Sequence, residues 1–266
     1  MNWLEIISLG LLILGVYKYQ KNWVPVHPSF YQTGELVKIG HRGASALAPE
    51  NTVASFTKAV ETGIMGVELD VQYSADKQLV VFHDWELKTL NSSDKIIEKM
   101  PYSEIEKISL NDNENNKIPL FREVLNVLSK KCIIVVEIKS AHFINTGIEK
   151  NVLDILNNYN FEQNCIISSF NPVILWRIRK LNPNILKAFL WSKTNPQFIL
   201  NSPLWVWLCR PDAFHADIEH LNENLMNWIH IKKMSVLTFT VKTPSNLSKA
   251  KQLGVDGIIM EDPYLN

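Results

Sequence analysis

The sequence predicts an α/β fold, a (β/α)8 TIM barrel with a hairpin and loop insertion after the second strand and an apolar helix at the N-terminus. From residue 37 to residue 266, eight short runs of β-branched and aliphatic residues alternate with amphipathic stretches. Such alternation is typical of parallel strands joined by right-handed helical crossovers. Eight units in about 250 residues indicate a closed barrel rather than an open sheet.

The individual elements follow in chain order. The predicted barrel strands are residues 37–41, 66–72, 133–138, 165–169, 186–191, 213–216, 236–241 and 257–260. The predicted helices are residues 52–62, 120–131, 148–159, 172–181, 222–232 and 245–253. Each predicted helix repeats its apolar residues at the spacing expected for one buried face.

One further β-rich run, residues 79–83, follows the second strand after only about six residues. A parallel crossover needs a dozen residues or more, so we expect this run to pair antiparallel with the second strand. The turn would lie near residues 74–77, at the barrel end where enzymes of this fold have their active sites. The polar stretch from about 85 to 117 is then an insertion.

The N-terminus differs in character from the rest. Residues 1–21 contain an uncharged run from residue 6 to residue 17, and residues 22–36 form a predicted linker with two prolines and a glycine. We expect residues 1–21 to be a single membrane-anchoring helix. The alternatives are a cleaved signal and a buried amphipathic helix. Lys18 and Lys21 follow the run, which would place the domain of residues 37–266 in the cytoplasm.

The composition excludes several classes of protein. The 27 Lys and Arg residues balance the 27 Asp and Glu residues, so we expect no nucleic-acid partner held by charge. No segment points to an obligate protein partner. The three cysteines, Cys132, Cys165 and Cys209, have no CxxC spacing and are predicted to be buried thiols.

Three carboxylates are candidate metal ligands. Glu68 and Asp70 lie two positions apart in the second strand, so both point to one face, and the alternate positions are apolar. Glu137 lies near the end of the next parallel strand, with Lys139 on its face. Converging carboxylates repel each other unless a cation or protons compensate. Their oxygens suit Mg²⁺ or Ca²⁺ rather than zinc, although ion pairs with Arg42 and Lys139 would also explain them.

Two histidines end β-rich runs, where barrel enzymes carry their reactive groups. His41 ends the first strand and His83 ends the hairpin. Histidine titrates near neutral pH and can accept or donate a proton. Arg42, next to His41, offers a planar fork of donors that suits a phosphate. His215 and Asp217, at another predicted strand end, are weaker candidates for lining the pocket.

These motifs resemble the glycerophosphodiester phosphodiesterase family. The resemblance covers about residues 37–264 and rests on His41-Arg42-Gly43-Ala44, Pro49-Glu50-Asn51-Thr52, Glu68-Leu69-Asp70-Val71, His83-Asp84, Val136-Glu137-Ile138-Lys139, Ser168-Ser169-Phe170 and Gly254-Val255-Asp256-Gly257-Ile258-Ile259. The family pattern implies a distorted barrel. It also implies a divalent cation, Mg²⁺ or Ca²⁺, on Glu68, Asp70 and Glu137.

The resemblance also implies roles for the other residues. His41 and His83 would be the acid/base pair, and Arg42 and Lys139 would lie near the phosphate. Glu50 would either contact the residues that line the site or be a carboxylate at the start of a helix. Two positions depart from the family pattern. Phe239 stands where a tryptophan is usual, and Met260-Glu261-Asp262-Pro263 stands where Thr-Asp followed by Pro is common. Both departures concern the choice of substrate.

The expected reaction is hydrolysis of a glycerophosphodiester, such as glycerophosphocholine, to glycerol 3-phosphate and an alcohol. The attacking group would be water or the glycerol hydroxyl of the substrate. One alternative is a lysophospholipase D that releases lysophosphatidic acid, favoured by the expected anchor and by the apolar segment 203–208. Another alternative, disfavoured by the complete set of reactive residues, is a non-catalytic barrel that binds lipid or metal.

Overall fold

The computed structural model describes residues 3–21, 23–31, 34–87, 94–110, 116–130, 132–140, 142–195 and 197–266. The predicted anchor, linker and insertion therefore lie partly outside the described residues, at positions 1–2, 22, 32–33, 88–93 and 111–115.

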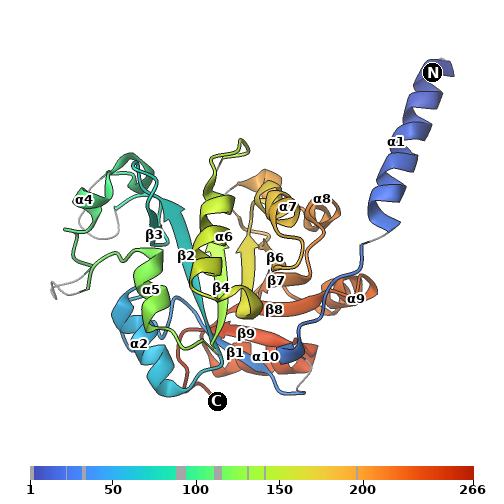
Figure 1. Cartoon of the computed structure of the whole chain (residues 1–266). Helices are drawn as coiled ribbons and strands as arrows, with labels where there is room; N and C mark the ends of the chain where they lie inside the picture. The colour runs from blue at the N-terminus through green and yellow to red at the C-terminus, as the bar shows by residue number, and fades with distance from the viewer. Residues whose placement is uncertain are drawn as a thin grey trace.

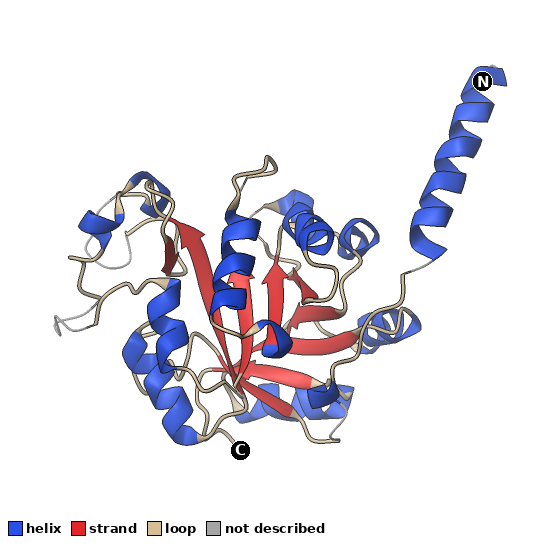
Figure 2. Cartoon of the chain, viewed as in Figure 1, coloured by secondary structure: helices blue, strands red, loops and turns tan. Residues whose placement is uncertain are grey.

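Eight parallel strands close into a barrel that is surrounded by helices (Figure 2). They are β1 (Val37–Gly40), β2 (Gly66–Tyr73), β4 (Ile133–Ile138), β5 (Cys165–Ser169), β6 (Leu186–Trp191), β7 (Ala213–Asp217), β8 (Ser235–Val241) and β9 (Gly257–Met260). Neighbours pair in the order β1-β9-β8-β7-β6-β5-β4-β2, and β1 also pairs with β2. This closure confirms the predicted (β/α)8 TIM barrel.

The extra strand β3 (Leu79–Val81) pairs antiparallel with β2, with Tyr73 opposite Leu79. Its turn is closed by Ser74, whose N–H donates to the carbonyl of Gln78 at 3.0 Å. Lys77 adopts a left-handed conformation with φ 61° inside this turn. The predicted hairpin is therefore present, because so short a loop cannot return the chain for a parallel pairing.

The helices lie outside the strands (Figure 1). The longer ones are α1 (Trp3–Lys21), α2 (Val53–Thr62), α5 (Phe121–Val127), α6 (Ile148–Asn158), α7 (Pro172–Leu181), α9 (Glu223–Ile231) and α10 (Pro244–Leu253). Short turns are α4 (Tyr102–Ile105), α8 (Val206–Cys209), η1 (Ser29–Tyr31), η2 (Ile97–Lys99), η3 (Glu162–Asn164), η4 (Phe198–Asn201) and η5 (Pro203–Trp205). The helix predicted for residues 120–131 ends early, because Leu128 has an extended backbone.

Polar side chains define where several helices begin. Thr52 accepts a hydrogen bond from the backbone of Ser55 at 3.1 Å and caps α2. Asn222 and Thr243 cap α9 and α10 in the same way. Such caps satisfy backbone donors that the helix itself cannot pair, and each contributes about 1 kcal/mol. Gly254 ends α10 in the left-handed region, with φ 68°.

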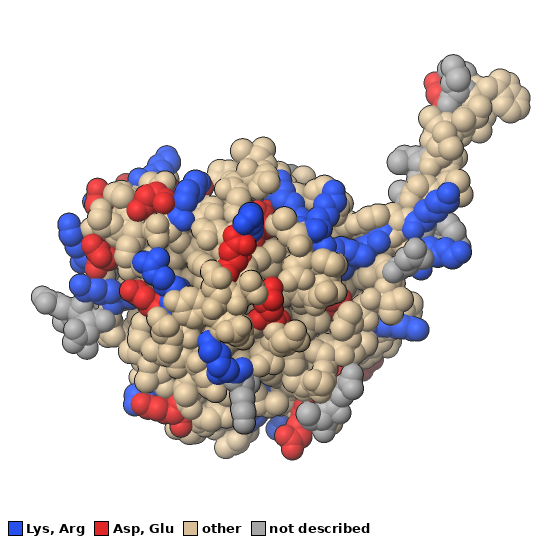
Figure 3. All heavy atoms as spheres, viewed as in Figure 1, with Lys and Arg blue, Asp and Glu red and all other residues tan. Residues whose placement is uncertain are grey.

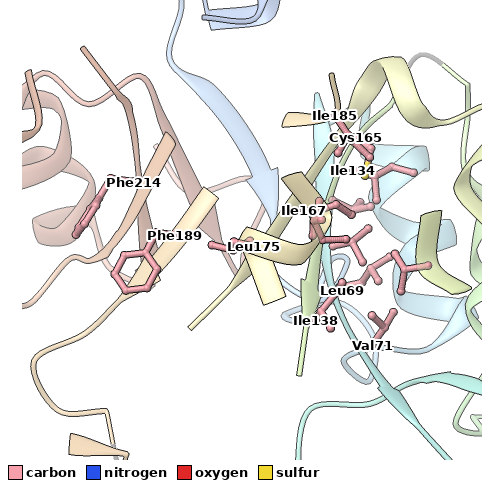
Figure 4. Packing of buried hydrophobic residues seen from close by; sticks show 14 of the residues in the cluster. Leu69, Val71, Ile134, Ile138, Cys165, Ile167, Leu175, Ile185, Phe189 and Phe214 are labelled. Atoms are coloured by element: carbon pink, nitrogen blue, oxygen red, sulfur yellow. The ribbon is translucent and has the colours of Figure 1, made fainter. Parts of the chain in front are cut away.

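Apolar side chains form a layer on each side of the barrel wall. The outer layer packs strands against helices and includes Leu69, Ile167 and Leu175 (Figure 4). The inner layer fills the lower part of the barrel with residues from the strand beginnings. Phe30 and Tyr31 of η1 pack against this inner layer, so part of the predicted linker covers the amino-terminal end of the barrel.

Asp212, just before β7, ties that covering segment to the barrel. Its Oδ1 accepts a hydrogen bond from the backbone of Val26 at 3.1 Å. Its Oδ2 lies 3.1 Å from the Nζ of Lys187 and accepts from the Lys187 backbone at 3.0 Å. Both side chains are buried.

We expect Asp212→Ala to lower the free energy of unfolding by about 3 kcal/mol, because it leaves a buried charge without its partner. Urea denaturation followed by circular dichroism would measure the loss. Glu61→Ala is the matched control, since it removes the exposed Lys58–Glu61 pair and should leave the unfolding midpoint unchanged. Equal midpoints for wild type and Asp212→Ala would contradict the prediction.

His215 lies inside the barrel, between Leu190 and Leu237 in the strand register. It is fully buried, and neither ring nitrogen has a hydrogen-bond partner among the described residues. Burial lowers the pKa of His215 to about 3, whereas an unfolded histidine titrates near 6.5. Between these values the unfolded chain binds more protons, so the free energy of unfolding falls as the pH decreases.

From this residue alone we expect a loss of about 2 kcal/mol between pH 7.5 and pH 5. In His215→Leu the free energy of unfolding should therefore fall by about 2 kcal/mol less between these two pH values than in the wild type. Urea denaturation at each pH would measure both changes. The same pH dependence in the variant and the wild type would refute this account of His215.

The N-terminal helix α1 extends away from the barrel (Figure 1). Among the described residues, no helix is both long enough and apolar enough to cross a membrane. The prediction of a membrane anchor at residues 1–21, with the location derived from it, is therefore wrong. The physical reason is that Glu5, Lys18 and Lys21 leave only 12 uncharged residues between them, well short of a span of about 20.

The last turn of α1 is held by the segment before β7. Tyr19 Oη donates to the carbonyl of Leu208 at 2.8 Å, and its ring lies under the guanidinium of Arg210.

Elsewhere on the surface, acidic and basic side chains are interspersed over the viewed face (Figure 3). The three cysteines are free and buried, as predicted.

Candidate active site

Three carboxylates converge at the carboxyl ends of β2 and β4. Glu68 and Asp70 come from β2, and Glu137 comes from β4, where it pairs with Asp70 in the register. One oxygen from each carboxylate lies within 4.8 Å of the others. Glu68 and Asp70 are buried and Glu137 is nearly so, so their charges are poorly solvated.

Burial and mutual repulsion oppose the negative charges of this cluster. Burial, together with the neighbouring carboxylates, raises the pKa of Glu68 well above its usual range, and burial also raises the pKa of Glu137. Burial opposes the charge on Asp70 as well, but Lys139, His83 and Arg42 together lower its pKa to about 2. A cation among these oxygens would favour the ionised form of all three.

The donor set fits a divalent cation. The Oδ1 atom of Asp70 is buried and has no hydrogen-bond partner among the described residues. Carboxylate oxygens are the ligands that Mg²⁺ and Ca²⁺ prefer. Glu68, Asp70 and Glu137 could therefore hold such an ion.

A tight turn after β1 brings His41 and Arg42 to the same edge. A Cβ atom on Gly40 would lie 2.2 Å from the carbonyl oxygen of Gly43, so this turn requires glycine. Arg42 adopts a left-handed conformation with φ 52°. Its backbone N–H donates to Oε2 of Glu68 at 3.0 Å, which fixes that carboxylate.

The side chain of Arg42 is held between two acids. Its Nη1 donates to Oε1 of Glu50 at 2.5 Å, and its Nε lies 3.4 Å from Oδ2 of Asp70. Asn51 donates from Nδ2 to the same Asp70 oxygen at 2.9 Å. The contact with Glu50 thus helps to keep the Arg42 guanidinium beside the carboxylate cluster.

The two histidines line the same cavity beside the cluster. The Nε2 atom of His41 lies 4.0 Å from Oε2 of Glu68, and burial lowers the pKa of His41. His83 is more exposed, and its Nδ1 lies 2.7 Å from Oδ1 of Asp84. On the β4 side, Lys139 Nζ lies 3.4 Å from Oε1 of Glu137 and 3.8 Å from Oδ1 of Asp70.

Two cavities open over these groups. The inner one, of about 160 Å³, is lined by His41, Arg42, Glu68, His83 and Glu137 together with apolar residues. The outer one, of about 510 Å³, extends over the ends of β4 to β8 and contains Lys139, Ser192 and Asp217. The two share His83, Glu137, Phe170 and Phe239, so they form one continuous depression.

The structure thus gathers most of the predicted site residues around one depression. They are His41, Arg42, Glu68, Asp70, His83, Glu137 and Lys139. Asp217 lines the outer cavity, whereas His215 lies below it in the barrel interior. Phe239, in place of the usual tryptophan, packs edge-on against Phe170 with ring centroids 6.1 Å apart.

Three groups near the site had no role in the sequence analysis. Asn51 orients Asp70, Asp84 contacts His83, and Glu261 lies 3.8 Å from His41 Nδ1. Asn51 and Asp84 belong to the motifs that carry the resemblance, and that was their only signal. In the sequence, Glu261 stood out only as a departure from the family pattern. Nothing in the residues around it predicts a contact with His41 after the first strand.

Residues 41–265 match the model of the glycerophosphoryl diester phosphodiesterase family. A glycerophosphodiester phosphodiesterase of Caldanaerobacter subterraneus subsp. tengcongensis is 32% identical over 233 residues, which cover 85% of this chain and 93% of that protein. The glycerophosphodiester phosphodiesterase structure from Thermotoga maritima superposes with a TM-score of 0.69 at 31% identity, covering 86% and 95%. The structure of an Oleispira antarctica phosphodiesterase, solved with its product sn-glycerol-3-phosphate, superposes with a TM-score of 0.77 at 25% identity. The match covers 88% of this chain and 96% of that one.

Proposed function

The chain belongs to the glycerophosphoryl diester phosphodiesterase family, and on this premise we propose that it is a metal-dependent hydrolase that splits glycerophosphodiesters into glycerol 3-phosphate and an alcohol. The observation that carries the proposal is the convergence of Glu68, Asp70 and Glu137 beside two histidines in one depression. The sn-glycerol-3-phosphate bound to the Oleispira antarctica relative supports the same product here.

The three carboxylates would hold Mg²⁺ or Ca²⁺, and such an ion would neutralise the phosphodiester charge and polarise its P–O bonds. Arg42 and Lys139 would bind the non-bridging oxygens, and their positions beside Asp70 support this role. The Glu50 contact keeps the Arg42 guanidinium in that position.

His41 and His83 would carry out the proton transfers. One would take the proton of the attacking hydroxyl, and the other would protonate the leaving alcohol oxygen. The attacking hydroxyl comes from water or from the glycerol moiety of the substrate, and in the second case a cyclic phosphate forms first. The outer cavity, lined in part by Ser192 and Asp217, would hold the leaving alcohol.

The lysophospholipase D alternative depended on the anchor and on residues 203–208. The anchor prediction is wrong, and the segment forms η5 and the first three residues of α8. Val206 is buried against the barrel helices, whereas Leu204 and Trp207 are exposed. Single exposed apolar side chains are common on protein surfaces, so these two do not by themselves favour that alternative over the water-soluble diester.

The test is a direct comparison of substrates. The purified chain is assayed with glycerophosphocholine and with lysophosphatidylcholine, each with Mg²⁺ and with Ca²⁺. We expect glycerol 3-phosphate from the first substrate. Release of lysophosphatidic acid alone would replace the proposal by the lysophospholipase D alternative, and no turnover of either substrate would leave the non-catalytic barrel.

A further inference from the structure

His41 has a buried ring nitrogen without a hydrogen-bond partner. Its Nδ1 makes no hydrogen bond with any described residue, and the one carboxylate at ion-pair distance from it among those residues is Glu261, whose Oε1 lies 3.8 Å away. This neighbourhood follows from the β1–β9 pairing, in which Gly40 lies opposite Met260. The residues that follow on each strand, His41 and Glu261, are therefore side by side.

Glu261 is itself fixed from the other side. Its Oε1 lies 2.8 Å from Nζ of Lys242, in the loop between β8 and α10. The contacts with His41 and Lys242 lower the pKa of Glu261 to about 2, so the carboxylate is ionised near neutral pH. The contacts of Glu261 with Lys242 and with His41 thus connect the ends of three neighbouring strands, β8, β9 and β1, beside the inner cavity.

A carboxylate can only accept a hydrogen bond, so it selects the histidine tautomer that carries its proton on Nδ1. Nε2, the other nitrogen of His41, then has a free lone pair, and it faces Glu68 at 4.0 Å. We propose that Glu261, held by Lys242, is the positioning residue that keeps the proton of His41 on Nδ1 and so makes Nε2 the general base. This proposal rests on the proposed phosphodiesterase function.

The separation of 3.8 Å exceeds a hydrogen bond, but such contacts commonly tighten when substrate binds. In the reaction, Nε2 takes the proton of the attacking hydroxyl as the new O–P bond forms. The P–O bond to the leaving alcohol breaks, and that oxygen receives a proton from His83. As the acid, His83 carries a proton on each ring nitrogen. Asp84, 2.7 Å from Nδ1, accepts one of them, which leaves the Nε2 proton for the leaving oxygen.

The first test places the proton without measuring activity. Nitrogen-15 NMR of the histidine side chains in the full-length protein, with and without Mg²⁺, should show His41 protonated on Nδ1. In Glu261→Gln, whose amide can accept or donate, the Nε2–H tautomer should gain population. His41 protonated on Nε2 in the wild type, or an unchanged tautomer in Glu261→Gln, would overturn the proposal.

The second test is kinetic. Glu261→Gln should lower kcat for glycerophosphocholine by about 10- to 100-fold with KM nearly unchanged, because the base is misplaced while binding is kept. Asp262→Asn is the matched control, since the Asp262 side chain accepts a hydrogen bond only from the backbone of Tyr264 among the described residues, and the variant should keep wild-type kcat. Lys242→Met should also lower kcat, but by a smaller factor, with KM nearly unchanged. If Glu261→Gln does not fold, Lys242→Met takes its place in this test.

A substrate with a p-nitrophenolate leaving group separates base from acid. This group leaves without a proton, so the loss in Glu261→Gln should persist if His41 is the base. Disappearance of the loss would overturn the assignment. If the wild type hydrolysed no diester at all, the proposed function would fail, whereas the NMR result would still decide where the His41 proton lies.

Discussion

Removal of divalent cations with a chelator should lower the rate of glycerophosphocholine hydrolysis by about 10³-fold or more, and added Mg²⁺ or Ca²⁺ should restore it. The reason is the buried cluster of Glu68, Asp70 and Glu137. Burial and the neighbouring carboxylates raise the pKa values of Glu68 and Glu137, and a bound cation would favour their ionised forms. Asp70→Asn should cause a similar loss that added metal does not repair.

Binding can be followed independently of turnover. A ligand that binds only the folded state raises the melting temperature, so Mg²⁺ or Ca²⁺ should raise it for the wild type and raise it less for Asp70→Asn. Chelator already saturated with Ca²⁺ is the control for non-specific effects. Full activity in excess chelator, with no metal found by elemental analysis, would refute metal dependence.

His41→Ala and His83→Ala should each lower kcat by about 10²- to 10⁴-fold, the range for loss of a general acid or base. Both residues follow strand ends and line the inner cavity, so the barrel core should remain intact. Turnover of glycerophosphocholine at saturating metal measures the effect, and circular dichroism checks the fold.

His230→Ala is the matched control for these two variants. His230 lies near the end of α9 and is exposed, so its removal should leave kcat and the melting temperature unchanged. Wild-type kcat in both His41→Ala and His83→Ala would show that proton transfer at this site uses other groups.

Much of the barrel could be predicted because its local signals agree with its tertiary structure. Buried parallel strands are short apolar runs, and four of the eight, including 133–138 and 186–191, have the predicted limits. The hairpin followed from the short connection between β2 and β3. The prediction of a membrane anchor failed because it gave too much weight to the apolar character of residues 6–17. The shortness of this run and the charges on either side of it argue against a membrane span.

The carboxylate cluster was also accessible from the sequence. A strand has a period of two, so Glu68 and Asp70 had to share a face, and a parallel register brought Glu137 beside them. The resemblance to a family supplied the roles of His41, Arg42 and His83. Those roles remain proposals until the variants above are measured.

The sequence by itself thus determined the barrel, its hairpin and the residues that could meet at the carboxyl ends of the strands. Only the tertiary structure decided which partners those residues have. Glu261 meets His41 although 220 positions separate them in the chain, because closing the barrel pairs the first strand with the last. Asp212 holds Val26 for a related reason: its partner depends on how the N-terminal segment packs across the barrel end. Such contacts depend on register and closure, which no local pattern of residues records.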